Sequence, residues 1–560
     1  MSRRLFSRSG GESCCVGFLV AFALGVSAYI RFWGFTLPEF DLICNLVSHS
    51  QKNIQGLVYC FTQPQNNYLS TSVNYRPIPA LVLWFTHLLF GFNLHLLHWI
   101  NFLLHGLNTA LVYVLTKKLL RGKKIFPLAS AALFAYHPIH LQTVLFASRM
   151  PEPLVLFGML LSLLSIMRYV EGAGKKYYVS SIGFCFIAIF SKPTGALTPL
   201  ILLLYLHLYV DWNLKRKIKT ITPHLTLIPL YFILMYSVLG GLGGYGGNHI
   251  QFRYSVLNLV TGLLDPTDQL KISYFPKIYS LTSQWGIQLL FYVGLAAGSL
   301  FLLYKIRGKK NLVFPATTFL LIALAYLASQ MVVNPWYLYI LCAPYSITLA
   351  TYFSQIFDGD DFVSKIQKTV FFVYLFVVIL HSPLLRSYTA FHSASQTTGS
   401  YLDQIVNFSE DLPKDSTLYL VNTPEYLVFK GKGYPYSCFM ASEASVKALL
   451  DYHYPGKNLK TYSLLSSTLA SEGGAFRVSS SWRDDCILEA LNRNRRKATL
   501  KPSVCWMGDC AGKRGFPVKR TPRGWEVFFS EDKSKDAFVL TFNGAAVSGH
   551  PLELNCGGFE

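Results

Sequence analysis

Long apolar runs alternate with short polar and basic segments along the chain as far as about residue 385. The first run covers residues 15–34, about 20 residues, which is enough for a helix to cross the hydrocarbon core of a bilayer. A second run follows at residues 95–116, and later runs end at residues 368–385. Counting one crossing for each run of roughly 20 apolar residues predicts about 11 transmembrane helices.

Basic residues gather between alternate pairs of these runs, and this arrangement predicts the orientation of the helices. Loops rich in Lys and Arg stay in the cytoplasm. The N-terminus is therefore expected inside, the loop at residues 35–94 outside, and the C-terminus outside. The basic clusters lie at residues 117–124, 168–176, 215–219 and 305–310.

The remaining chain is mixed and polar, which predicts two domains. Residues 1–386 form an α-helical transmembrane domain, and residues 387–560 form an extracytoplasmic α/β domain. The segment at residues 78–91 is short, begins after a proline and contains His87, so we expect a helix on the outer membrane surface. Within the second domain we expect strands at residues 417–421, 525–529 and 537–542, and helices at residues 442–452 and 484–492.

Composition supports a membrane protein and narrows its chemistry. The 560 residues are 52% hydrophobic and 14% charged, with a mean hydropathy of +0.34, which excludes an ordinary soluble protein. The formal net charge of +21 is concentrated largely in the basic loops. Because the basic stretches of the second domain are predicted to be outside the cell interior, no nucleic-acid partner is expected. The sequence has no Walker loop, dinucleotide fingerprint or zinc-type cysteine pair.

Cysteines fall in the compartment where disulfides can form. Cys44 and Cys60 lie in the first outer loop, where either a bridge or two free buried thiols fit the sequence. Five more lie in the C-terminal domain, where spacing does not define their pairing: Cys438, Cys486, Cys505, Cys510 and Cys556.

Ionisable and polar residues gather at the outer ends of the predicted helices. Such residues are costly at a membrane and indicate function. A carboxylate there can deprotonate an acceptor hydroxyl, and cations can stabilise a leaving lipid phosphate. Plain solvation of the acids, or anchoring of Arg76 and Arg149 to lipid headgroups, explains the same pattern. The candidate residues are Glu39, Asp41, Tyr75, Arg76, His137, His140, Arg149, Lys192 and Tyr337.

One predicted helix also has polar residues along its length. His98, Asn101 and His105 share a helical face. Contact with an acceptor is one interpretation, but hydrogen bonds between helices are favoured, because polar groups in a bundle find such partners.

Four segments follow one another along the chain: NYRPIP, the HWINFLLHG helix with Asn-x-x-x-His spacing, AYHPIHLQTVLFASRMPEP, and SKPTG. In this order they resemble the membrane core of the GT-C glycosyltransferases. The nearest resemblance is to transmembrane and tetratricopeptide-repeat O-mannosyltransferases and their bacterial relatives. Protein O-mannosyltransferases and the lipid A aminoarabinose transferase are more distant. The likeness covers roughly residues 30–205 and is weaker to about residue 350.

This resemblance implies an inverting hexosyltransferase that uses a polyprenyl-phosphate monosaccharide. Its base would be Asp41 or Glu39, in the stretch LPEFDLICN, and no cofactor or divalent metal is expected. For the clamp on the departing phosphate we expect Arg76, Arg149 and Lys192, the cations at the outer ends of the helices. Partners would be the membrane lipid carrier and a glycan, lipid or protein acceptor. The chain departs from the family pattern at Pro38, Gln142, Pro193 and Trp336.

The domain content of the chain bears on its host, and the position of its polar residues bears on its function. Tetratricopeptide repeats are missing, which favours a bacterial inner membrane with a periplasmic C-terminal domain over an endoplasmic reticulum membrane. A lipid or polysaccharide transporter, or a non-catalytic GT-C-like scaffold, is the alternative. A transporter places polar residues near the middle of several spans. Here they concentrate at one end, which favours the enzyme.

Overall fold

A computed structural model describes most of the transmembrane part and the better-defined elements of the C-terminal part. The described residues are 8–32, 39–66, 68, 74–120, 125–241, 263, 308–328, 335–356, 362–380, 388–421, 423–429, 438–439, 441–463, 466–472, 475–479, 497–500, 518–521, 524–528, 537–542 and 547–551. The predicted helix at 484–492 and the longer fourth outer loop lie outside these residues, apart from residues 240, 241 and 263.

The chain divides into two compact units. The first contains Met1–Phe35, His49–Gln65 and Ser70–Tyr388, and the second contains Thr36–Ser48, Asn66–Leu69 and Thr389–Glu560. The main boundary therefore lies two residues after the expected position. In addition, two pieces of the first outer loop group with the C-terminal unit.

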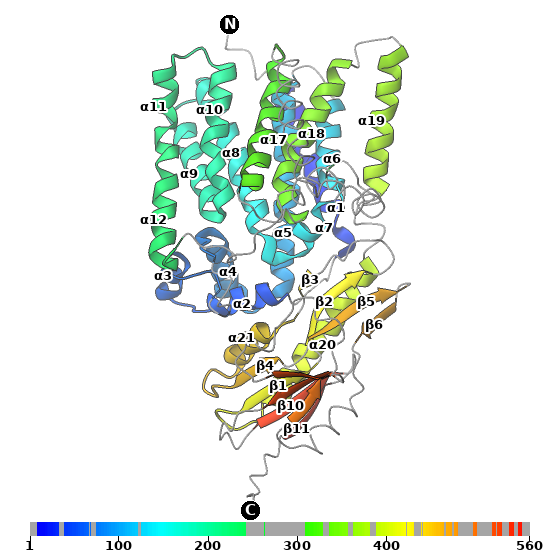
Figure 1. Ribbon diagram of the computed structural model, residues 1–560. Coiled ribbons are helices and arrows are strands. Elements are labelled where there is room, and N and C mark those ends of the chain that lie inside the picture. The colour runs from blue at the N-terminus through cyan, green and yellow to red at the C-terminus, as the bar shows by residue number, and fades with distance from the viewer. Residues whose placement is uncertain are drawn as a thin grey trace, which may run out of the picture. The chain divides into compact units, whose positions relative to one another are not determined.

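The first unit is a bundle of long apolar helices that run alongside one another (Figure 1). Among the described residues, four short 3-10 helices, η1 (Ile30–Phe32), η2 (Ala147–Arg149), η3 (Pro193–Leu197) and η4 (Pro335–Tyr337), lie in its connections. Its helices are α1 (Arg8–Ser27), α3 (Ile54–Thr62), α4 (Pro77–Phe90), α5 (Leu94–Leu119), α6 (Ile125–Tyr136), α7 (His140–Leu145), α8 (Pro151–Val170), α9 (Lys175–Ser191), α10 (Thr198–Tyr209), α11 (Leu214–Leu225), α12 (Leu227–Leu239), α17 (Lys310–Ala328), α18 (Leu338–Ile356) and α19 (Phe362–Leu380).

Within the described residues, three helical segments are both long and apolar enough to cross a membrane: Leu94–Leu119, Ala147–Val170 and Leu214–Leu239. Five shorter apolar helices accompany them. The predicted crossing at residues 95–116 corresponds to α5. Helix α6 ends at Tyr136, shortly before Pro138, and the short helix α7 begins at His140. The chain is an integral membrane protein.

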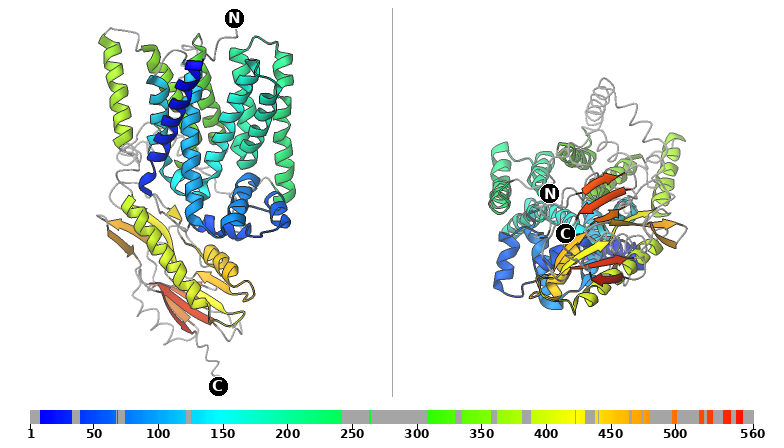
Figure 2. Two further views of the ribbon diagram at one scale, coloured as in Figure 1. Left: turned by 180° about the vertical axis from the view of Figure 1, so that it is seen from behind. Right: turned by 60° about the horizontal axis from the view of Figure 1, so that its bottom comes forward.

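Glycines bring neighbouring helices of the bundle close together. A Cβ atom on Gly25 of α1 would lie 2.7 Å from the Cα of Gly106 on α5. Seen from behind, α1 runs beside α5 (Figure 2). A Cβ on Gly158 of α8 would lie 2.7 Å from the backbone nitrogen of Ala188 on α9. Small residues at helix contacts allow this approach, since packing rather than hydrophobicity holds helices together in lipid.

The polar face of α5 is used inside the bundle. The side-chain amide of Asn101 donates to the carbonyls of Thr143, Val144 and Phe146 at 2.7, 3.0 and 3.2 Å. His105 hydrogen-bonds with the hydroxyl of Tyr339 at 3.0 Å and with the carbonyl of Ala135 at 3.1 Å. The favoured interpretation, hydrogen bonding between helices, is confirmed for Asn101 and His105. These bonds tie α7 and α18 to α5.

The second unit combines helices with three small sheets. Strand β1 (Thr417–Val421) lies between β10 (Ala537–Phe542) and β4 (Lys460–Ser463), parallel to both, and β11 (Val547–Pro551) extends this sheet antiparallel to β10. The second sheet has the order β3-β2-β5-β6, and the third β7-β9-β8. Their strands are Cys438–Phe439, Thr423–Phe429, Ser466–Glu472 and Ala475–Ser479, then Lys497–Leu500, Gly524–Phe528 and Val518–Thr521.

Helices α20 (Tyr388–Ser409) and α21 (Glu443–His453) belong to the same unit, as does α2 (Phe40–Ser48) from the first outer loop. The predicted strands at 417–421 and 537–542 match β1 and β10. Cys44 and Cys60 are both free and buried. Of the two alternatives, two free buried thiols are therefore confirmed and a disulfide bridge is not. Four of the five C-terminal cysteines lie outside the described residues, and the side chain of Cys438 is not described.

Candidate functional site

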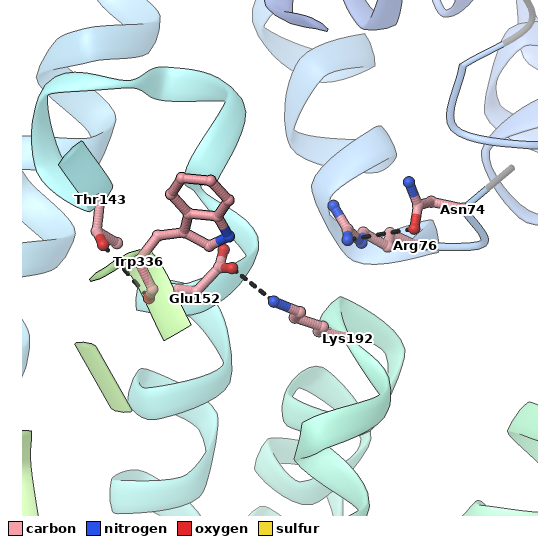
Figure 3. A network of polar contacts seen from close by, with 6 residues as sticks. All are labelled: Asn74, Arg76, Thr143, Glu152, Lys192 and Trp336. Atoms are coloured by element: carbon pink, nitrogen blue, oxygen red, sulfur yellow. Dashed lines mark hydrogen bonds and ion pairs between the residues drawn. The ribbon is translucent and has the colours of Figure 1, made fainter. Parts of the chain in front are cut away.

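A buried ion pair joins two neighbouring helices of the first unit. The Lys192 Nζ lies 2.6 Å from the Glu152 Oε1. Both residues are nearly inaccessible, at 6% and 2% exposed. Figure 3 shows the two side chains pointing toward each other from the end of α9 and the start of α8. A charge pair at this depth is costly unless its partners are well placed, which makes the pair a candidate functional site.

Local sequence explains where the two charges sit. Lys192 is extended, with φ −167° and ψ 149°, and Pro193 follows it, so α9 stops at Ser191 and η3 begins. A Cβ on Gly195 would overlap the carbonyl of Ala188, so only glycine lets η3 fold against the end of α9. On the partner helix, Pro151 occupies the start of α8 and Glu152 its first turn, where a carboxylate suits the helix dipole.

Aromatic rings cover the neighbouring cations. The Lys192 Nζ lies 4.2 Å from the ring centre of Tyr337, and the Arg149 guanidinium lies 4.5 Å from that of Trp336. Both rings come from η4. The Thr143 hydroxyl donates to the Trp336 carbonyl at 3.4 Å, which ties η4 to α7 (Figure 3). Cations over aromatic faces are stabilised by the ring quadrupole.

Several charges act on Lys192 together. Burial lowers the pKa of Lys192 to about 8; Glu152 opposes this shift, while Arg76 and Arg149 add to it. These four groups therefore belong to one electrostatic cluster, which we call the basic cluster. Its three cations against one carboxylate leave a formal excess of two positive charges (3 − 1 = 2). Such a cluster attracts a small anion with one or two negative charges.

The basic cluster has unused hydrogen-bonding capacity among the described residues. Arg76 donates from Nη2 to the Asn74 side chain at 3.3 Å, but its buried Nε has no partner there. The Glu152 Oε2 is likewise buried and unpartnered. Buried polar atoms are nearly always satisfied, so these two atoms are candidates for contacts with a ligand. A donor on Arg76 suits a phosphate oxygen, and an acceptor on Glu152 suits a hydroxyl.

Three other candidate residues are held in the protein core. The Tyr75 hydroxyl donates to the Phe61 carbonyl at 3.0 Å, and the Tyr75 carbonyl accepts from Tyr231 at 2.8 Å. His137 and His140 are both fully buried. His137 hydrogen-bonds with the carbonyl of residue 263 at 3.1 Å, and the His140 ring packs 4.7 Å from those of Phe134 and Tyr339. Their predicted contact with substrate stays a prediction.

The two candidate bases lie in the second unit. Glu39 directly precedes α2 and is buried, at 1% exposed, while Asp41 stands in the first turn of that helix. Because the cations lie in the first unit, convergence of acid and basic cluster stays a prediction. The structure thus groups Arg76, Arg149, Lys192 and Tyr337, and holds the acids on a different unit.

Sequence reasoning missed Glu152 as the partner of Lys192 and Trp336 as the cover of Arg149. Glu152 lies between Pro151 and Pro153, in the turn after Arg149, and no sequence signal links it to Lys192. Trp336 is notable in the sequence only as a departure from the family pattern. Among the residues described, no group of three or more His, Cys, Asp or Glu is placed to hold a metal ion. The expectation that no metal or cofactor is needed stays a prediction.

Residues 74–240 match the family model described as dolichyl-phosphate-mannose-protein mannosyltransferase. The match covers Arg76, Arg149, Glu152 and Lys192, which are the charged members of the basic cluster. It confirms over these residues the resemblance to GT-C glycosyltransferases, and it supports a role in glycosyl transfer. Among proteins of curated function, none matches the chain.

Similar solved structures are distant. The apo oligosaccharyltransferase of Archaeoglobus fulgidus is 13% identical, with 74% of this chain and 62% of that chain covered and a TM-score of 0.43. This chain thus spans less than two thirds of the archaeal protein. ArnT from Cupriavidus metallidurans bound to undecaprenyl phosphate is 12% identical, with 93% and 98% covered and a TM-score of 0.44. At such TM-scores, the family match is the comparison that bears on chemistry.

Proposed function

We propose that the protein is an inverting glycosyltransferase that moves a hexose from a polyprenyl-phosphate carrier to a glycan, lipid or protein acceptor. The reaction takes place at the extracytoplasmic face of the membrane. The basic cluster binds the lipid phosphate, and Asp41 or Glu39 is the base. No metal or cofactor takes part.

The observation that carries this proposal is the charge of the basic cluster. A polyprenyl-phosphate sugar is a phosphodiester with one negative charge, and the released polyprenyl phosphate is a monoester with up to two. A cluster with an excess of two positive charges therefore binds the leaving group more strongly than the donor. Interactions that strengthen toward the transition state accelerate the reaction.

The chemistry balances with residues of this chain. The carboxylate of Asp41 or Glu39 takes the proton of the acceptor hydroxyl, and the acceptor oxygen forms a bond to the anomeric carbon. The bond from that carbon to the phosphate oxygen breaks on the opposite face. The phosphate keeps the electron pair, and Arg76, Arg149 and Lys192 offset its growing charge. Attack opposite to the leaving group inverts the anomeric centre.

The same proposal includes the topology of the chain. It has about 11 crossings, with the C-terminal α/β domain outside, in a bacterial inner membrane; an endoplasmic reticulum membrane is the other setting. The outer location suits a donor whose sugar is presented on that face. Trp336 and Tyr337 offer flat apolar rings of the kind that can pack against a sugar or prenyl unit beside the cations.

Transfer is tested with purified protein in detergent and a panel of labelled polyprenyl-phosphate hexoses. We expect release of polyprenyl phosphate from the wild-type protein with at least one sugar. Glu39→Ala/Asp41→Ala should lower the rate by roughly a hundredfold or more, the usual range for loss of a general base. The control is Asp211→Ala/Asp403→Ala, which removes two exposed acids elsewhere.

Each result has a definite meaning. No release with any hexose, together with binding of polyprenyl phosphate, contradicts the enzyme and supports the scaffold or transporter. Unchanged turnover in Glu39→Ala/Asp41→Ala contradicts the assignment of the base. Loss of turnover in the control double variant as well indicates damage unrelated to the site.

A further inference from the structure

Helix α11 combines cations and apolar residues at one end of the bundle (Figure 1). Together with α12 it forms the apolar segment Leu214–Leu239, which is long enough to cross a membrane. The Lys and Arg residues of this segment are confined to the first six residues of α11, LKRKIK. Cations at the end of a crossing helix lie where the hydrocarbon core meets the lipid headgroups, because their long side chains reach out of the core.

One stripe of α11 attaches the helix to the bundle. Lys217, Ile221 and His224 follow one another at i, i+4 and i+7, and all three are buried. The His224 Nε2 hydrogen-bonds with the Ser181 hydroxyl of α9 at 3.0 Å. This stripe therefore fixes which side of α11 faces the other helices.

Two further stripes of α11 are exposed. Leu214 and Ile218, four residues apart, are 63% and 47% exposed and form an apolar stripe. Lys215 and Lys219, also four apart, lie beside it, with Arg216 next to them; all three are exposed, and we call them the α11 cations. An apolar stripe beside a cationic one suits a helix that contacts acyl chains with the first and headgroups with the second.

Few acids balance the α11 cations. Residues 211–225 contain four Lys or Arg and one acid, Asp211. Among the described residues, no acid forms an ion pair with any of the α11 cations. By contrast, Lys118 in the last turn of α5 is paired with Glu171 at 2.7 Å. The α11 cations are therefore available to an anion outside the protein.

Aromatic rings surround the start of α11. The Arg216 guanidinium lies 4.0 Å from the ring centre of Trp212. The Trp212 ring centre is 6.3 Å from that of Tyr169 on α8, which is 5.0 Å from that of Tyr178 on α9. Trp and Tyr gather where a bilayer meets water, because their rings are apolar and their polar groups stay hydrated. This belt suits a position of Arg216 beside the headgroups, and stacking on Trp212 orders its guanidinium in advance.

We propose that α11 binds an anionic phospholipid, with the α11 cations against its phosphate and with Leu214 and Ile218 against its acyl chains. A lipid with a net negative charge is required, since the amine of a zwitterionic headgroup is repelled by the same cations. The site contacts α9 at Ser181, whereas Lys192 follows the far end of that helix. It is therefore distinct from the basic cluster and goes beyond the proposed glycosyl transfer.

The test uses the full chain in a non-ionic detergent and measures lipid binding by native mass spectrometry. Dioleoylphosphatidylglycerol and dioleoylphosphatidylcholine are the probes, because they share acyl chains and differ in net charge. Lys215→Gln/Lys219→Gln removes two exposed charges and keeps the apolar stripe. Lys215→Arg/Lys219→Arg retains the charges. The charge-matched control is Lys414→Gln/Lys460→Gln, which changes two exposed lysines of the second unit.

We expect the wild-type protein to bind phosphatidylglycerol more tightly than phosphatidylcholine. Each cation near an anionic lipid strengthens binding roughly fivefold, so Lys215→Gln/Lys219→Gln should bind its tightest phosphatidylglycerol roughly tenfold or more weakly. Its affinity for phosphatidylcholine should change little. The arginine variant and the charge-matched control should behave like the wild-type protein. Leu214→Ser/Ile218→Ser should weaken binding of both lipids, because acyl contacts are common to both.

Four results overturn the inference: equal affinity of the wild-type protein for the two lipids, unchanged phosphatidylglycerol affinity in Lys215→Gln/Lys219→Gln, an equal loss in the charge-matched control, or displacement of phosphatidylglycerol by a similar concentration of inorganic phosphate. The last result would identify a site for soluble anions instead of a lipid site. None of these measurements involves turnover, so their outcome is independent of whether the protein transfers a sugar.

Discussion

At the scale of single residues, Lys192 is the group on which opposing influences meet. Burial and the two arginines of the basic cluster favour its neutral form, and Glu152 favours its charged form. The result is a lysine with a pKa of about 8, within reach of ordinary assay conditions. Because the pKa of Lys192 is close to the pH of such assays, an anionic ligand beside it favours the charged form of the lysine.

The first prediction concerns pH. As pH rises through about 8, Lys192 in the ligand-free protein loses its proton, so affinity for polyprenyl phosphate should fall. The phosphate itself contributes little to this change, since its second pKa is near 6. Lys192→Met should bind more weakly at pH 7 and show no such fall. The test is the affinity of both proteins for polyprenyl phosphate, measured from pH 6.5 to 9.5. If affinity falls equally with pH in the wild-type protein and in Lys192→Met, Lys192 is not the group that titrates.

The second prediction concerns the buried pair. Lys192→Met leaves the Glu152 carboxylate without its cation, which should destabilise the protein by about 3–5 kcal/mol. Lys192→Met/Glu152→Leu should recover most of that loss, because two apolar groups replace a desolvated pair. Unfolding in detergent measures both. If the double variant is as unstable as the single one, the pair is not the dominant interaction there.

At the scale of elements, the turn between α9 and η3 places Lys192. The turn is tight because Gly195 lies directly on the Ala188 carbonyl. Any side chain at this position has to push η3 away from α9, and Lys192, at the start of η3, has to move with it.

The third prediction follows from that contact. Gly195→Ala should destabilise the protein by roughly 1–3 kcal/mol, the usual cost of overpacking, and weaken binding of polyprenyl phosphate. Gly183→Ala is the matched control on α9, since a Cβ there meets nothing within 4 Å. The control should be neutral or slightly stabilising, because alanine favours a helix. Equal effects of the two substitutions refute the role of Gly195.

At the scale of the whole molecule, the proposed function requires both units to work at the outer face. The fourth prediction tests this requirement by topology. A tag after Glu560 should be accessible to antibody in intact spheroplasts, and a tag inserted between Asp211 and Asn213 only after permeabilisation. Asp211 and Asn213 precede the basic helix α11, which the positive-inside rule assigns to the cytoplasm. The reverse pattern would exclude transfer by this arrangement.

Much of the fold could be predicted from periodicity and hydropathy, because these are local properties. The crossing that became α5, the surface-helix segment that became α4, and strands β1 and β10 all lay within a few residues of their expected bounds. The hydrogen bonds from Asn101 to the carbonyls of Thr143, Val144 and Phe146 could not be predicted, because they depend on which helices pack together.

For the site, too, local features could be predicted from the sequence and tertiary contacts could not. Sequence alone determined a basic, polytopic membrane chain with charged groups at the ends of its helices, because hydropathy and charge are read along the chain. Tertiary structure decided that Lys192 pairs with Glu152, 40 residues away, and that α2 groups with α21. Such partners depend on which helices pack together, and packing is a property of the folded molecule that no local pattern encodes.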